Sequence, residues 1–438
     1  MDDCKEKKLP LEIVENIINV VDDKKTLKAC ALACSYFQRN CQRRLFWDFE
    51  ISCDRDDAAF QEGGLIHTIV HTNLDTNVVS LIRYLKIENR YGVWGMYGGG
   101  KAIDHMLGGF IKKLTALEKL DVRGAGLELR HGELVNGLIT VLQLSSLREL
   151  KLASLEFFPI QIILWGQSLR RVEFKRVMFV PSIVPGGLKK PLISPSLEEL
   201  KMDNRKNGCS ILGLDLLSSA LGQAAFTKLK KLHLEYRESE GDRPSDIDRL
   251  LSACQSSLED LNLFLTHDGM LQISMLAALT EHEFPAYKYN KEYAQSIRLS
   301  RMTSLRRFST HVYVTTRDGY LEEEHPFRFL RDLFLECSPT LESIHLLCFH
   351  RFGDAGDQNI PEVSGWSELD RVLMSCPGLR EISVVVCCTQ CTPDQRAAHQ
   401  GVYDLPMVIR ARNIKFERQF TDVSYELNIS LTTRQLSF

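Results

Sequence analysis

A single pattern recurs through the middle and the end of the chain: apolar, two variable residues, apolar, one variable residue, apolar. Its last step has a period of two, which is typical of a short strand with apolar side chains on one face. Helix-period stretches such as 246–254 and 368–376 separate the copies. One strand and one helix cannot bury their apolar faces alone, so we expect stacked copies with parallel strands on one side and helices on the other. The copies begin at Ile82, Leu117, Leu147, Leu169, Leu197, Leu229, Leu258, Leu305, Leu341 and Leu379.

The copies also share a local spelling, as in TALEKLDV, SSLREL, PSLEEL, SSLEDL and PGLREI. This pattern resembles leucine-rich repeats over roughly residues 75–400. The run Cys376–Ile382 resembles the helix-to-strand junction of the irregular, cysteine-containing kind. The spacing is uneven, and the interval between Leu263 and Leu305 holds either a degenerate repeat or a loop. The resemblance implies an irregular solenoid, with 414–420 and 425–431 as last strands that cap the stack.

The first fifty residues do not share this repeat. Ile13 and Ile17 lie at helical spacing beside Val14 and Ile18, so the apolar stripe is too wide for a helix resting on one shallow surface. Asp22 and Asp23 interrupt the helix and can cap a second one, which is followed by a third segment over 35–47. Short helices in so few residues bury little core, which favours stabilisation by a partner.

The first element contains Leu9, Pro10, Ile13 and Ile17, the second Leu27, Leu32 and Cys34, and Phe37, Leu45 and Trp47 follow. With these residues the three elements resemble the F-box, in order and at the N-terminal side of the repeats. The resemblance implies docking on a Skp-type adaptor, through it a cullin, and a role as substrate receptor of a ubiquitin ligase whose other members supply catalysis. The alternative is a plain interaction scaffold in which the same residues form the core of a helical cap; Ile13 and Leu32 fit either role. The positions that the resemblance assigns to adaptor binding are Leu9, Pro10, Ile13, Ile17, Leu27, Leu32, Cys34, Phe37, Leu45 and Trp47.

We therefore predict an α/β chain: a small helical domain over 5–50, a transition over 51–74, and a leucine-rich-repeat-like solenoid over 75–438. At 438 residues the chain exceeds the size of one compact core. The net charge of −3 gives no general attraction to nucleic acid or anionic lipid. No apolar run approaches the roughly 20 residues that span a bilayer. Thirteen irregularly spaced cysteines without a secretion signal indicate reduced thiols, hence cytoplasm or nucleus.

Two strings invite a chemical role. Gly95–Ala102 fits a phosphate loop up to its last position, where Ala102 replaces the Ser or Thr that would hold magnesium. A nucleotide-dependent enzyme is therefore the least supported class. Cys387, Cys388 and Cys391 could hold zinc with Cys376 or His399, but only one Cys-x-x-Cys pair is present, and metal binding stays open. We predict no catalytic residue and no cofactor, and we assign no residue to a metal site.

The variable residues beside the last two apolar positions of each copy face the open side of the strands. They are charged in the early copies and become more apolar from the seventh copy onward. We expect this later, more apolar patch to contact a protein substrate, because exposed aromatic and aliphatic residues often anchor interfaces. Alternatively, rim loops cover it. The predicted substrate contacts are Asn262, Phe264, His311, His345, Leu347 and Val385.

Overall fold

The structure, a computed structural model, shows an α/β chain in which helices alternate with parallel strands. It divides into two compact units, residues 1–195 and 196–438. Within the described residues, no helix is long and apolar enough to cross a membrane. The described residues are 10–33, 35–52, 64–71, 76–89, 100–128, 132–156, 158–180, 194–203, 220–238, 244–267, 297–315, 326–351, 365–389 and 415–422.

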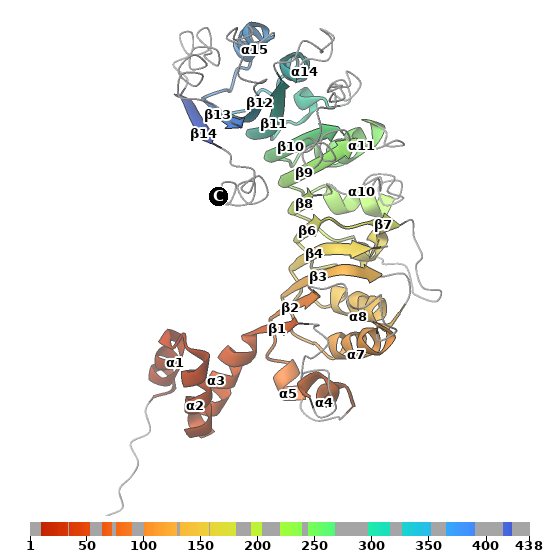
Figure 1. The fold of residues 1–438 in the computed structure, drawn as a ribbon, viewed down its shortest axis with the longest axis vertical. Helices are drawn as coiled ribbons and strands as arrows, with labels where there is room; N and C mark the ends of the chain where they lie inside the picture. The colour runs from red at the N-terminus through yellow and green to blue at the C-terminus, as the bar shows by residue number, and fades with distance from the viewer. Residues whose placement is uncertain are drawn as a thin grey trace, which may run out of the picture. The chain divides into compact units, whose positions relative to one another are not determined.

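The first unit begins with helices α1 (Leu11–Val20), α2 (Lys24–Ala33) and α3 (Ser35–Trp47) (Figure 1). Their ends are set by specific contacts. The Pro10 carbonyl accepts hydrogen bonds from the first turn of α1. Asp23 caps α2, because its Oδ2 accepts from both the backbone nitrogen and the hydroxyl of Thr26 at 2.7 Å. These hydrogen bonds hold the pKa of Asp23 below its ordinary value, and the one from the Thr26 hydroxyl has the largest effect.

The strands of the first unit follow directly. Strand β1 (Asp48–Ser52) starts at the residue after α3 and pairs in parallel with β2 (Tyr84–Asn89). Next come β3 (Lys119–Glu128), β4 (Glu149–Glu156) and β6 (Arg171–Lys175), each parallel to the strand before it. Helices α7 and α8 lie together on one side of these strands (Figure 1). The remaining elements are α4 (Leu65–His71), α5 (Thr76–Val79), α7 (Gly100–Lys112), α8 (Glu133–Leu142), β5 (Phe158–Pro159), η1 (Ile160–Trp165) and β7 (Phe179–Val180).

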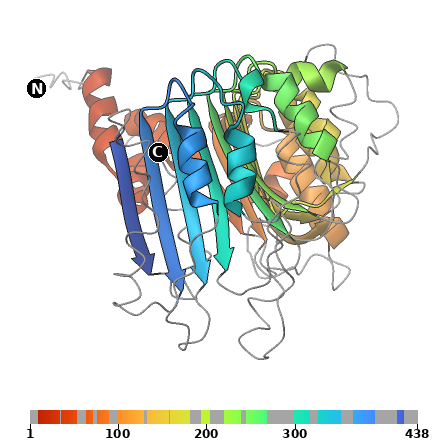
Figure 2. The same cartoon turned by 90° about the horizontal axis from the view of Figure 1, so that it is seen from above.

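The second unit repeats the arrangement. Its strands pair in parallel from β8 to β9 and β10, and then from β10 through β11, β12 and β13 to β14. Helices α14 and α15 lie against one face of the later strands (Figure 2). The strands are β8 (Glu199–Asp203), β9 (Lys231–Glu238), β10 (Asp260–His267), β11 (Arg307–Thr315), β12 (Ser343–Arg351), β13 (Glu381–Thr389) and β14 (Lys415–Asp422). The helices are α10 (Ala220–Phe226), α11 (Pro244–Cys254), η2 (Leu299–Arg301), α14 (Pro326–Phe334) and α15 (Trp366–Leu373).

The recurring apolar positions form the core. In each copy from Ile82 to Val384 the first, second and third positions of the pattern are buried, and equivalent positions of neighbouring strands pair in register, as in Leu120 with Leu150. The one polar member, Thr310, is also buried. Its hydroxyl donates to the carbonyl of Leu263 on the neighbouring strand at 2.7 Å, which satisfies the group without water.

A backbone ladder joins successive copies at the start of the strands. The carbonyl of Arg83, just before β2, accepts from the nitrogens of Glu118 and Lys119 at 2.7 and 3.0 Å. The same two-donor arrangement recurs at the following junctions within the units as far as that between β12 and β13, and between β13 and β14 the Arg380 carbonyl accepts from the nitrogen of Lys415 at 3.0 Å. The carbonyls that accept in this way are those of Arg83, Glu118, Arg148, Glu198, Lys230, Glu259, Arg306 and Glu342.

The structure changes several expected boundaries. The 51–74 segment is more than a transition, because residues 51 and 52 belong to β1 and residues 65–71 form α4. Phe46–Ile51 is a further copy of the apolar pattern, although residues 46–50 were predicted as part of the helical domain and Ile51 as part of the transition. Strand β10 pairs directly with β11, so the interval after Leu263 adds no strand between them. The predicted last strand over 414–420 corresponds to β14, whereas 425–431 lies outside the described residues.

Candidate binding surfaces

The three N-terminal helices enclose a small core. Val14, Ile18, Leu27 and Cys41 are buried in it, and Phe37 and Leu45 are partly buried against it. Burial raises the pKa of the Cys41 thiol above its ordinary value. Leu27, Phe37 and Leu45, which were predicted as adaptor contacts, therefore serve at least in part as internal core.

The other side of α1 carries aliphatic side chains that the core does not cover. Ile13 and Ile17 are each 45% exposed and Val20 is 78% exposed. Their spacing of four and three residues places them on one stripe of the helix, beside the buried stripe of Val14 and Ile18. The wide apolar stripe seen in the sequence is thus divided into a buried half and an exposed half. Val20 was not among the predicted contacts, although its spacing from Ile13 and Ile17 was the signal for it.

The remaining predicted adaptor contacts differ in their surroundings. Leu32 on α2 is 89% exposed and Pro10 is exposed. Trp47 lies at the end of α3, where the guanidinium groups of Arg43 and Arg83 lie 5.7 and 6.0 Å from its ring. Its carbonyl accepts from the nitrogen of Arg83, so Trp47 also joins α3 to the first strands. Leu9 and Cys34 lie outside the described residues.

The open face of the first unit is the one opposite the buried strand positions. Charges alternate in sign from strand to strand across it, through Glu50, Lys86, Asp121, Lys151 and Glu173. Neighbours pair with one another, as Lys86 with Glu50 at 2.7 Å and Lys151 with Glu173 at 2.8 Å. These charged groups already satisfy one another.

Asp121 is the buried member of this row. Arg123 holds its carboxylate through both oxygens, at 3.0 Å from Nε and 2.8 Å from Nη2. The Tyr84 hydroxyl lies 3.4 Å from the same group, and burial raises the pKa of Tyr84. The bidentate pair compensates the buried charge.

The open face of the second unit differs. Phe264, His311 and Val385, which were expected to form an exposed apolar patch, are buried and do not form such a patch. The ring centroids of Phe264 and His311 lie 3.4 Å apart, and that of His233 lies 5.1 Å from Phe264. Asn262, His345 and Leu347 are half-buried and keep some accessible surface. A role for these residues in substrate binding stays a prediction.

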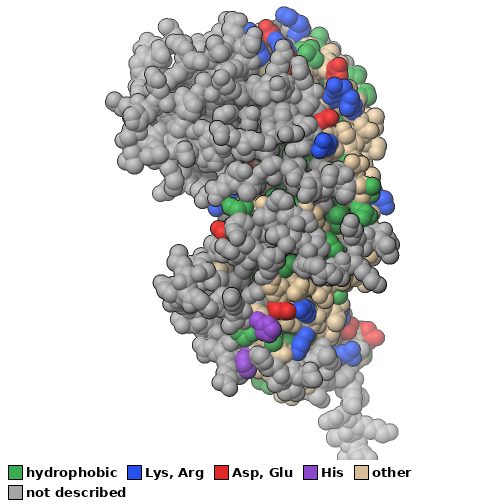
Figure 3. All heavy atoms as spheres, turned by 90° about the vertical axis from the view of Figure 1, so that its right-hand side faces the viewer, with side chains coloured by type: hydrophobic (Ala, Val, Ile, Leu, Met, Phe, Trp, Pro, Cys, Tyr) green, Lys and Arg blue, Asp and Glu red, His purple; other side chains and the backbone are tan. Residues whose placement is uncertain are grey.

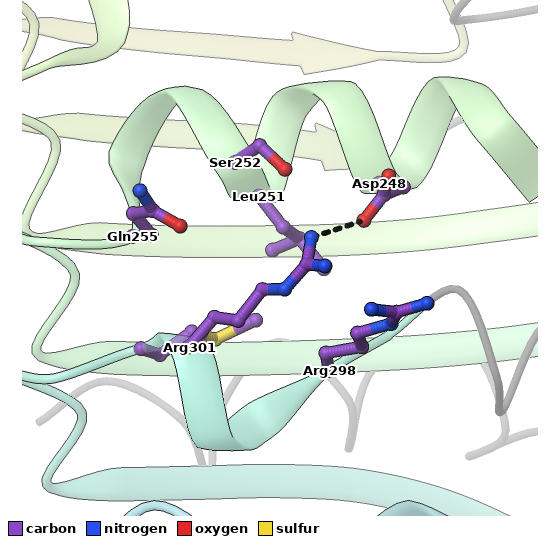
Figure 4. Close-up of a pocket in the computed structure, with 7 residues that line it drawn as sticks. Asp248, Leu251, Ser252, Gln255, Arg298 and Arg301 are labelled. Carbon is purple, nitrogen blue, oxygen red and sulfur yellow. Dashed lines mark ion pairs between the residues drawn. The ribbon is translucent and has the colours of Figure 1, made fainter.

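A shallow cleft on the second unit brings arginines to α11. Arg298 and Arg301 lie beside Asp248, Leu251, Ser252 and Gln255 (Figure 4). Arg301 Nη1 is 4.0 Å from the Asp248 carboxylate, a long ion pair between partly exposed groups, which contributes little stability. On the described part of the face in Figure 3, acidic and basic side chains also lie among one another.

The strings with a chemical appearance are only partly described. Within the described residues no group of His, Cys, Asp and Glu side chains is placed to hold a metal ion. Cys376 is buried before β13, whereas Cys387 and Cys388 lie near the far end of that strand, so roughly 20 Å of strand separates them. Cys376 therefore cannot complete a zinc site with them. Cys391 and His399 lie outside the described residues, as do residues 95–99 of the phosphate-loop string.

The chain was also compared with known proteins. No family model and no curated protein matches it.

Proposed function

We propose that the chain is a non-catalytic substrate receptor of a Skp/cullin/F-box ubiquitin ligase. Helices α1 to α3 dock on a Skp-type adaptor, and the strand-and-helix repeats, which act as leucine-rich repeats, bind a protein substrate. The observation that carries the proposal is the exposed stripe of Ile13, Ile17 and Val20 beside a core that is already filled by Val14 and Ile18.

An exposed aliphatic stripe of this kind supports a docking role. Covering one such side chain with a partner is worth about 1.5–3 kcal/mol when burial is complete. Because Ile13 and Ile17 are already about half covered, each can contribute about half of that amount. Leu32 on the neighbouring helix adds a further exposed aliphatic side chain. The sequence resemblance to the F-box supplies the kind of partner.

Binding to a purified Skp-type adaptor tests this proposal. We expect the full chain to bind and Ile17→Asp to bind at least about tenfold more weakly, because a carboxylate would be desolvated at the interface. Asn16→Asp is the matched control, since it adds the same charge at an exposed position of the same helix. Circular dichroism checks that both variants keep their helices.

Two results would contradict the docking role. If Ile17→Asp and Asn16→Asp bind the adaptor as tightly as the parent chain, the exposed stripe is not the docking surface. If the parent chain itself does not bind, the ligase role is wrong and the chain is an interaction scaffold with a helical cap.

A further inference from the structure

The open face of the second unit carries one row of uncharged polar side chains. At the position between the two buried residues of each strand, β10 to β13 present Asn262, Ser309, His345 and Ser383. We call these residues the neutral row. The register places them side by side on adjacent strands, which in a sheet lie about 4.8 Å apart. All are half-buried.

The side chains of the two adjacent rows already contact one another. Toward the start of the strands, Arg307 pairs with Asp260 at 3.0 Å and Lys415 with Glu381 at 2.6 Å. Toward the end of the strands, the rings of Phe264 and His311 lie against each other, tilted by 39°, and are buried. The equivalent row of the first unit also differs, because its members pair by charge. The neutral row therefore stands apart as uncharged hydrogen-bonding groups.

Its members have capacity for further hydrogen bonds. The side-chain oxygen of Asn262 is buried and has no hydrogen-bond partner in the described part of the chain. A buried acceptor without a donor is unfavourable, and a donor from a ligand would satisfy it. Burial lowers the pKa of His345, against an opposing effect of Glu417, and this favours a neutral imidazole with one donor and one acceptor.

We propose that the neutral row binds an extended, uncharged polypeptide segment of the substrate, which lies across β10 to β13. Backbone amides and carbonyls are neutral donors and acceptors and match the side chains of the row. A charged side chain placed there would lose water, and the ions of the preceding row, Arg307 with Asp260 and Lys415 with Glu381, already pair with each other. The half-buried Leu347 beside the row adds an apolar contact. This inference rests on the proposed substrate-binding role of the repeats and names the class of segment they take.

A phage-displayed library of random peptides, selected on the immobilised full chain, tests the proposal. We expect the enriched peptides to be poor in Asp, Glu, Lys and Arg. Synthetic versions of them, measured by fluorescence anisotropy, should bind Asn262→Leu about tenfold more weakly, the effect of about 1.4 kcal/mol. Lys151→Leu, at the equivalent row position of the first unit, is the matched control and should bind as the parent does.

His345→Leu guards against a folding defect at one site, since it removes a second member of the row on another strand. The proposal is overturned if the enriched peptides are charged or if no peptide is enriched. It is also overturned if the peptides bind the parent and both row variants equally well. Analytical ultracentrifugation tests self-association. If the parent chain self-associates and Asn262→Leu is monomeric, the row binds a second copy of the chain and the proposal is overturned. Adaptor binding separates the two proposals: Asn262→Leu should bind the adaptor normally, and failure of the parent to bind it removes the ligase role alone.

Discussion

Replacing Gly108 by Ala tests how closely α7 and α8 approach each other. A Cβ atom on Gly108 would lie 2.7 Å from the backbone nitrogen of Leu134 and still closer to the carbonyl carbon and oxygen of Glu133. In turn, a Cβ on Gly137 would lie 2.9 Å from the Gly108 oxygen. Backbone atoms cannot rotate away as a side chain can, so the two helices would have to separate.

The expected cost is a balance of two effects. Ala stabilises a helix interior over Gly by roughly 0.5–1 kcal/mol, whereas overpacking costs about 1–3 kcal/mol or more when backbone must shift. The separation would also loosen the buried contacts of Phe110 and Leu138. We expect Gly108→Ala to destabilise the helix pair by about 2 kcal/mol. Gly109→Ala is the control, because its Cβ would meet only the Val70 side chain, at 3.3 Å.

Native-state hydrogen exchange is the suitable measurement, because the chain has two units and its unfolding need not be two-state. When the exchange rate follows the equilibrium between closed and open states, a loss of about 2 kcal/mol in opening free energy speeds exchange in α7 and α8 about thirtyfold. Gly109→Ala should leave the rate within a few-fold of the parent. Equal rates for the two variants would refute the close backbone approach.

Further predictions concern a helix cap, a hydroxyl and a thiol. Asp23→Ala should lower the helicity of the N-terminal helices near neutral pH. Because the folded-state pKa of Asp23 is lowered, its stabilising contribution is present above the ordinary pKa of 3.8 and is lost as pH falls through the lowered pKa. Circular dichroism spectra of the parent and the variant should therefore converge in acid. Ser257→Ala should lower the stability of the second unit by about 1 kcal/mol in urea unfolding, because the hydroxyl donates to the Leu229 carbonyl at 2.9 Å; Ser256→Ala, whose side chain has no such bond among the described contacts, should change it less. Burial raises the pKa of Cys254 to about 12, so mass spectrometry should find this thiol unmodified by iodoacetamide near pH 8 in the folded chain, and modification without unfolding would contradict its burial.

The repeated strands could be predicted because the apolar pattern carries its own period. The positions from Ile82 to Val384 are buried as the spacing indicated, and the parallel pairing follows from stacking alone. Several copies also have a Ser or Thr before their first Leu, but the sequence does not indicate which group its hydroxyl binds. In the structure the hydroxyls of Ser146, Ser257 and Thr340 donate to carbonyls of the preceding copy, which no local pattern could reveal.

The candidate surfaces were harder to predict. Periodicity indicated which side of a strand Phe264 and His311 would face, but not that their rings would contact each other and be buried. On α1 the sequence showed one wide apolar stripe, and only packing against α2 and α3 decided that Val14 and Ile18 lie inside and that Ile13 and Ile17 remain accessible. The copy at Phe46–Ile51 was missed because its first two residues, Phe46 and Trp47, also fit the end of the predicted segment over 35–47.

The ladder of shared carbonyls has a consequence for how such a chain can diverge. Each copy is tied to the next at the residue before its strand, whatever the number of residues that follow the strand. The closure entropy of a connecting segment grows only slowly with its length. Insertions after the strands therefore cost little, as the long interval between β10 and β11 illustrates. One rim of each unit is held constant, while the other is open to new sequence and hence to new binding partners.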